Sequence, residues 1–183
     1  MNFKPTFQLA LVAAAMFGAP VLHAASVSQD EYRTTKERIE AEYKDAKAAC
    51  DKLRDNAKDV CREEAKGKEK VARAELEYNR SGDPKDATKL AEAKADAAYG
   101  VAKEKCDDRT GNDKDVCVKE AKASHTKAMA DANMNKKVAA ARHDAAEDKR
   151  EADYKVAREK CDALSGDSKS SCLASLKSRY GKS

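Results

Sequence analysis

The sequence contains no Trp, and only 5% of its 183 residues are aromatic. Gly and Pro are also scarce, with 7 and 3 residues, so few positions interrupt regular structure. The hydrophobic share of 41% is dominated by alanine. So few large apolar side chains exclude a thick hydrophobic core, and they leave either disorder or long helices that pack through small residues.

Long blocks of one charge sign are absent as well. The 37 basic and 33 acidic residues alternate along the chain and leave a formal net charge of only +4. A basic arm or a stacking platform for nucleic acid needs clustered cations or interleaved aromatic residues. We therefore expect no nucleic-acid partner.

The only long apolar run lies near the N-terminus, over residues 9–22. Lys4 precedes it, and Leu22-His23-Ala24 resembles a small-residue cleavage site, so residues 1–24 are predicted to be a cleaved secretory signal peptide. The run is shorter than the roughly 20 residues of a membrane span, and no later stretch is apolar enough to replace it. These features predict a soluble exported protein, located in a bacterial periplasm.

The residues that are abundant, Ala, Lys, Glu and Arg, are the strongest helix formers. The predicted fold is all-α and coiled-coil-like, with helices over about 28–53, 58–79, 84–108, 114–163 and 169–180. Ser81-Gly82-Asp83-Pro84 is a clear break. The fourth helix is long because neither Gly nor Pro occurs between Asn112 and Ser165, and a weak bend at residues 133–135 is the alternative.

The six cysteines form three pairs that each enclose ten residues. The pairs are Cys50 and Cys61, Cys106 and Cys117, and Cys161 and Cys172. In every pair an Asp follows the first Cys, and a Lys stands three residues before the second. A Tyr lies seven residues before each first Cys, at Tyr43, Tyr99 and Tyr154. One unit of about 55 residues is therefore repeated about three times.

The middle of each cysteine frame predicts a turn, because Asp55-Asn56, Gly111-Asn112 and Gly166-Asp167 tolerate positive φ or cap a helix end. Asp113 or Asp115, and Ser168 or Ser170, are expected to cap the helices that follow. On an unbroken helix, cysteines eleven residues apart lie about 16 Å apart. A disulfide needs Cα atoms within roughly 7 Å, so we assign the bonds within each frame, across a helical hairpin. On a continuous helix the cysteines could bond only to another chain.

The repeat also sets the expected domain organisation. After the signal peptide we expect hairpin repeats over residues 25–83 and 84–139, and a truncated third repeat over 140–183. The three tyrosines are expected to pack over the disulfides. Gly100, inside a predicted helix, is interpreted as a close helix contact or a tolerated surface glycine.

A catalytic or metal-binding set is not evident in the sequence. His125 and His143 lie eighteen residues apart and are expected to face solvent. Zinc ligands usually lie two to four residues apart, and a redox Cys-x-x-Cys is missing. We therefore expect no catalytic residue, metal ligand or cofactor, and a protein that is not an enzyme.

Three Ala-, Lys- and Glu-rich runs, Glu37–Lys47, Glu63–Glu77 and Ala87–Lys105, resemble the helical stalk of TolA-like cell-envelope proteins. The resemblance covers most of the chain after the predicted signal peptide and is one of composition. The cysteine frame departs from that pattern.

These features predict a non-enzymatic helical spacer, scaffold or interaction protein of the bacterial cell envelope. The alternative is a stress-protective binder or holdase chaperone that shields apolar segments in its helical grooves. Expected partners are an envelope protein or peptidoglycan, and self-association through the alanine faces is a further expectation.

Overall fold

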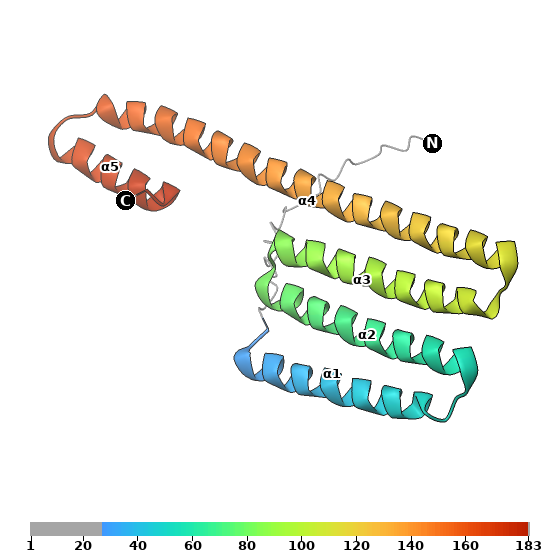
Figure 1. The fold of residues 1–183 in the computed structure, drawn as a ribbon. Helices are drawn as coiled ribbons and strands as arrows, with labels where there is room; N and C mark the ends of the chain where they lie inside the picture. The colour runs from blue at the N-terminus through green and yellow to red at the C-terminus, as the bar shows by residue number, and fades with distance from the viewer. Residues whose placement is uncertain (1–26, 183) are drawn as a thin grey trace, which may run out of the picture.

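The computed structural model describes residues 27–182, and the predicted signal peptide lies outside these residues. The described chain is helical throughout and contains no β-strand, which confirms the predicted all-α class. Its elements are α1 (Gln29–Cys50), α2 (Asp55–Ser81), α3 (Pro84–Lys105), the short 3₁₀ helix η1 (Cys106–Asp108), α4 (Gly111–Asp162) and α5 (Gly166–Tyr180) (Figure 1).

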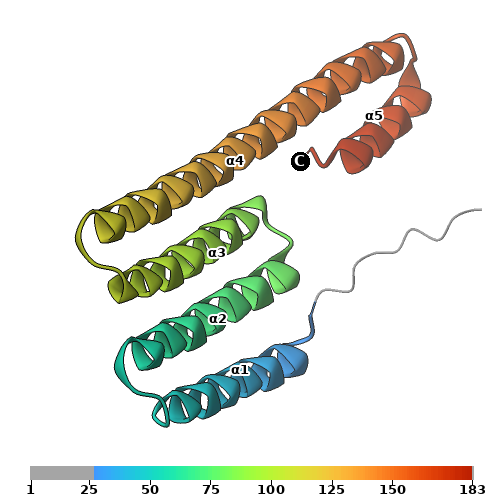
Figure 2. The same ribbon diagram turned by 90° about the vertical axis from the view of Figure 1, so that its right-hand side faces the viewer.

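The helices form a single layer and not a closed bundle. Each helix packs against the helix that follows it in the sequence, and the contact between α2 and α3 is the most extensive. Two views at right angles show α1, α2, α3 and the first part of α4 lying side by side in that order (Figures 1 and 2). The row has two edges, α1 and α4.

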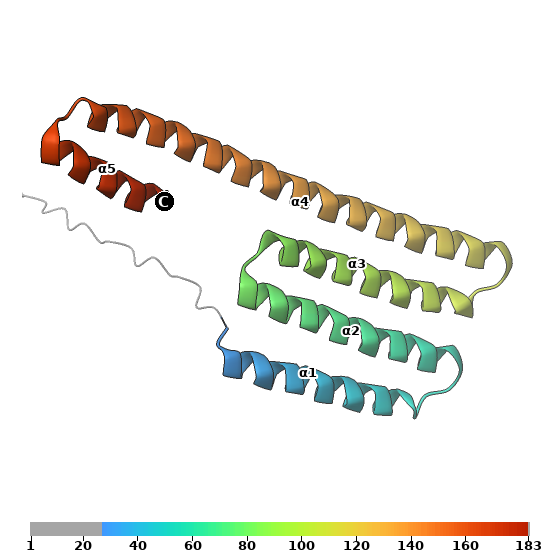
Figure 3. The ribbon, with the colours of Figure 1, turned by 60° about the vertical axis from the view of Figure 1, so that its left-hand side comes forward.

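α4 is much longer than its neighbour α3 and continues past the end of the row. It then meets α5, which lies on the same side of α4 as α3 does (Figure 3). Residues 140–150, between these two contacts, are exposed. α4 runs unbroken from Gly111 to Asp162, so the long helix forms without the alternative bend at 133–135. It also crosses the expected repeat boundary between 139 and 140.

In each hairpin the second helix begins three residues earlier than predicted. The second helix of the three frames begins at Asp55, Gly111 or Gly166, which have φ of 50°, 57° and 58°. The residues before them, Arg54, Thr110 and Ser165, are the N-caps and make no side-chain capping bond. The expected caps at Asp113 or Asp115 and at Ser168 or Ser170 are therefore wrong, because the positive-φ residue already starts the helix.

The core is thin and consists mostly of small residues. The buried apolar side chains are Ile39, Cys50, Ala65, Leu76, Ala95, Cys106, Ala121, Ala132, Cys161 and Leu176. The closest approach between helices involves Gly67 on α2, where a Cβ atom would lie 2.8 Å from the Cβ of Ala97 on α3. A Cβ at Gly100 would meet only the end of the Glu63 side chain, 2.9 Å from its Oε2. Gly67, which the sequence did not single out, therefore sets the spacing of α2 and α3.

These two glycines make a matched pair for mutation. Gly67→Ala forces the Ala97 backbone away, and such overpacking costs about 1–3 kcal/mol. Its gain in helix propensity is only about 1 kcal/mol, so we expect net destabilisation. Gly100→Ala keeps the propensity gain because Glu63 can turn aside. Thermal unfolding should show a melting temperature lower by about 2–4 °C for Gly67→Ala and unchanged or higher for Gly100→Ala. Equal shifts for both variants would contradict the close approach.

Candidate functional site

The turn ends of the three hairpins, called hairpin mouths below, are the most regular feature of the described chain. Disulfides join Cys50 to Cys61, Cys106 to Cys117 and Cys161 to Cys172, which confirms the predicted pairing. Their Cα atoms lie 5.6, 5.6 and 5.7 Å apart, within the reach of an ordinary disulfide. The first Cys of each pair is buried, with at most 1% exposed. Each bond fastens the end of one helix to the start of the next.

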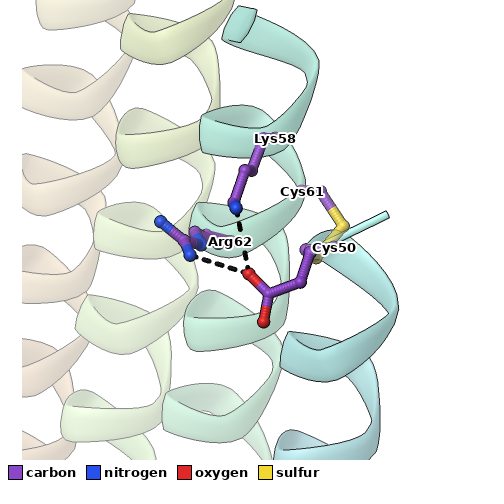
Figure 4. The surroundings of a disulfide bond; sticks show 5 residues. Cys50, Lys58, Cys61 and Arg62 are labelled. Carbon is purple, nitrogen blue, oxygen red and sulfur yellow. Dashed lines mark hydrogen bonds and ion pairs between the residues drawn. A yellow bond between two sulfur atoms is a disulfide. The ribbon is translucent and has the colours of Figure 1, made fainter. Parts of the chain in front are cut away.

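An ion pair repeats beside each disulfide. Asp51 lies 3.1 Å from Lys58, Asp107 lies 2.8 Å from Lys114, and Asp162 lies 3.0 Å from Lys169. Figure 4 shows the first mouth, where Arg62 adds a second contact of 2.8 Å to the same carboxylate. The repeated Asp and Lys of the cysteine frame are thus partners across the turn. In the sequence, the Asp after the first Cys and the Lys three residues before the second Cys recur in all three frames. This repeated spacing is the signal that could have identified the two residues as partners.

The ion pairs shift the acidity of the mouth carboxyls. Hydrogen bonds from Lys58 and then Arg62 hold the pKa of Asp51 below its ordinary value. The hydrogen bond from Lys114 lowers the pKa of Asp107 in the same way. A carboxyl with a lowered folded-state pKa stabilises the fold above its unfolded pKa and loses that contribution as the pH falls through the folded value.

We therefore expect the hairpin mouths to weaken on acidification. The melting temperature should fall as the pH drops below about 4, the ordinary pKa of Asp. In the variant Asp51→Asn/Asp107→Asn this fall should be shallower, because two of the titrating carboxyls are gone. Parallel melting curves against pH for the variant and the parent protein would contradict a stabilising role. The effect should also shrink in high salt, since these pairs are solvent-exposed.

The three repeated tyrosines point into their hairpins at an equivalent level. Tyr99 stacks on His125 with ring centroids 4.9 Å apart, and Tyr154 meets Tyr180 edge-on at 5.6 Å. Each facing residue stands eight positions after the second Cys of its frame. Tyr43 lines a small crevice between α1 and α2 that also includes Glu69, the equivalent residue. The tyrosines therefore form a second packing level, about two turns below each disulfide.

The prediction that His125 faces solvent is wrong. Its side chain is only 24% exposed, its Nε2 lies 2.8 Å from Oδ1 of Asp96, and its ring covers Tyr99. The cause is position, since the eighth residue after Cys117 necessarily faces α3. His143 is solvent-facing as predicted, with 70% of its side chain exposed. His125 thus links α3 to α4 and is a packing residue.

Other polar contacts tie neighbouring helices. The hydroxyl of Tyr32 on α1 donates to Glu77 on α2, and the Arg80 guanidinium lies 4.6 Å from the Tyr32 ring centroid. Asn56 donates to the carbonyl oxygen of Glu104 at 2.8 Å, between α2 and α3. Lys182 reaches Glu151 at 2.6 Å, next to the Tyr154 and Tyr180 pair. These bonds join α1 to α2, α2 to α3, and the segment after α5 to α4.

The hollows of the described surface are open grooves between helices. One lies between α2 and α3 and is lined by Gly67, Ala97, Ala98, Val101 and Ala102, with Glu64, Lys68 and Lys105 at its borders. Within residues 27–182, no three His, Cys, Asp or Glu side chains converge as a metal site would require. None of the helices described here has the length and apolar character needed to cross a membrane.

The predicted site residues thus divide into two structural levels in each hairpin, the disulfide with its ion pair and the tyrosine with its facing residue. Both levels have clear packing roles. Searches of protein-family models, curated proteins and solved structures found nothing that matches this chain.

Proposed function

We propose that this protein is a non-enzymatic helical spacer or scaffold of the bacterial cell envelope, acting in the periplasm. The observation that carries the proposal is the shape: a one-layer row of stapled helices continued by a long, largely exposed α4 that ends in a stapled hairpin. Such a layer offers wide polar surfaces and distance between its ends, which are the properties of a scaffold.

The disulfides support the proposed compartment. Three bonds and a thin alanine core fit a small exported domain, because staples compensate for limited apolar burial in an oxidising environment. In the chain-entropy model each short loop contributes roughly 3 kcal/mol. The predicted signal peptide supports the same route of export.

Partition into cell-envelope fractions tests the proposal. The purified oxidised protein should sediment with isolated peptidoglycan or with envelope membranes, and the reduced and alkylated chain should do so less. The reduced chain is the matched control because it keeps the same sequence while losing the staples. Partition equal to that of an unrelated helical protein of similar size and charge would contradict the proposal.

A holdase activity is the second candidate, favoured by the open groove between α2 and α3. Its floor of small apolar residues, Ala97, Ala98 and Val101 among them, could accept an extended apolar segment. The protein should then suppress aggregation of an unfolded client at low molar ratio. The variant Ala98→Glu, which places a charge in the groove, should lose this suppression while it stays folded; suppression unaffected by the variant, or absent from the parent, would count against the groove.

A further inference from the structure

α4 carries apolar residues on two opposite faces. Its inner face packs against α3 and α5 and includes the buried Ala121, Ala132 and Cys161. Its outer face holds Val116, Met134, Val138 and Val156, which are exposed by 42, 55, 42 and 58%. Met134 follows Ala132 by two residues, a turn of about 200°, so the two faces are opposed.

Five further alanines complete the outer face. They are Ala123, Ala130, Ala141, Ala145 and Ala152, all exposed. Successive members of the set lie three, four or seven residues apart, which keeps them on one face of a helix. We call these nine residues the α4 outer stripe. It extends along most of the helix.

The outer stripe lies at an unobstructed edge of the row. α3 and α5 both lie on the inner side of α4, so no other described helix covers the outer side (Figures 1 and 3). The opposite edge differs, since α1 carries no large hydrophobic residue among the exposed ones in the described chain. One edge of the layer is thus polar. The other presents a largely apolar seam, which Lys127 and Asp148 interrupt on the same face between Ala123 and Ala130 and between Ala145 and Ala152.

We propose that the α4 outer stripe is the interface of an antiparallel homodimer, with α4 of one copy packed along α4 of a second copy. The twofold axis passes near Ala140. In this register Met134 faces Ala145 of the other copy and Val138 faces Ala141, so large residues meet small ones. Alanine allows close approach of the two helices. This pairing does not rest on the envelope role proposed above.

The charges that flank the stripe select this register. Asp131 comes opposite Lys149 on one flank, and Lys137 comes opposite Asp144 on the other. Further out, in the same register, Glu120 comes opposite Lys160. The symmetry of the dimer makes every pair occur twice. Such complementarity between positions on one helix is the property expected of a surface that pairs with its own copy.

The flanking charges near the axis are available for such pairing. Within the described residues, three of these four charges, Asp131, Lys137 and Lys149, take part in no ion pair of their own chain. The fourth, Asp144, is exposed and lies 3.7 Å from Nδ1 of His143 on the same helix. Residues 118–162 of the two helices overlap, which corresponds to about 65 Å of contact at 1.5 Å per residue. The dimer would place the two rows edge to edge with the paired α4 helices at the centre, and would cover the exposed stretch 140–150.

Sedimentation of charge-reversal variants of the full chain tests the proposal. We expect the parent protein to dimerise reversibly with concentration. Lys137→Glu and Asp144→Lys each replace two attractions by two repulsions and should weaken association about tenfold. The double variant Lys137→Glu/Asp144→Lys restores opposite charges and should recover the parent dimer. Lys36→Glu, the same change on exposed α1, is the control and should have no effect.

Orientation is tested by zero-length carbodiimide cross-linking of a mixture of isotope-labelled and unlabelled protein. We expect cross-links between chains that join Asp131 to Lys149 and Lys137 to Asp144. The isotope mixture identifies the links between chains, because such a link joins a labelled peptide to an unlabelled one. Within one α4, Asp131 and Lys149 lie about 27 Å apart and cannot be joined. A protein that stays monomeric at high concentration, a dimer without these links, or a double variant that is not rescued would overturn the proposal.

Discussion

Removing the third disulfide, in the variant Cys161→Ala/Cys172→Ala, should unfold α5 while the four-helix row stays folded. α5 has 15 residues, and it packs against α4 alone. Its only buried residue is Leu176. Isolated helices of this length are marginal in water, and the staple contributes roughly 3 kcal/mol to the local hairpin. Hydrogen exchange should therefore show loss of protection confined to residues 166–180.

The matched control is Cys106→Ala/Cys117→Ala, which removes the second staple. α3 remains packed between α2 and α4, and the Tyr99 and His125 stack with the Asp96 contact still joins it to α4. This variant should melt at a lower temperature but keep all its helices protected. Equal protection of α5 in both variants would show that the packing of Leu176 and Tyr180 suffices without the bond.

The difference between these variants could be only partly anticipated from the sequence. The cysteine frame, the turn residues within it and the scarcity of Gly and Pro together predict stapled hairpins, and the structure confirms them. Local signals suffice for this because each disulfide closes a turn between helices that are adjacent in the chain.

The single layer could not be predicted in the same way. Alanine-rich helices have several faces able to pack, so the pattern does not say whether the helices close into a bundle. The contact of Gly67 with Ala97 decides the spacing of α2 and α3, but it joins different repeats and lies outside the cysteine frame. His125 was misplaced for a related reason. Its place follows only when the two helices of the hairpin are compared. His125 stands eight residues after Cys117, and Tyr99 stands seven residues before Cys106, so the disulfide between these cysteines brings the two rings to the same level.

α4 should behave as one rigid element, and Ala145→Pro should break it. Ala145 lies in the exposed stretch 140–150. Proline inside a helix removes a backbone hydrogen bond, clashes with the preceding turn and costs about 3 kcal/mol or more. Because no other helix of the described chain covers this stretch, nothing within a monomer holds the two halves of α4 in line there, and the effect is measured at concentrations that keep the protein monomeric. The break should separate the four-helix row from the C-terminal hairpin into two bodies that change their relative orientation.

Spin labels introduced as non-natural residues at Lys127 and Glu159 would measure this effect without disturbing the disulfides. The two positions are 32 residues apart on α4, so a straight helix places them about 48 Å apart. Dilution into unlabelled protein keeps the distances within one chain. The parent should give a narrow distribution and Ala145→Pro a shorter, broader one, whereas Ala145→Gly, which costs only about 1 kcal/mol, should keep the parent distance. A narrow distance distribution in Ala145→Pro would mean that contacts outside the helix hold α4 straight. The length of the proposed spacer would then depend on those contacts and not on the continuity of α4.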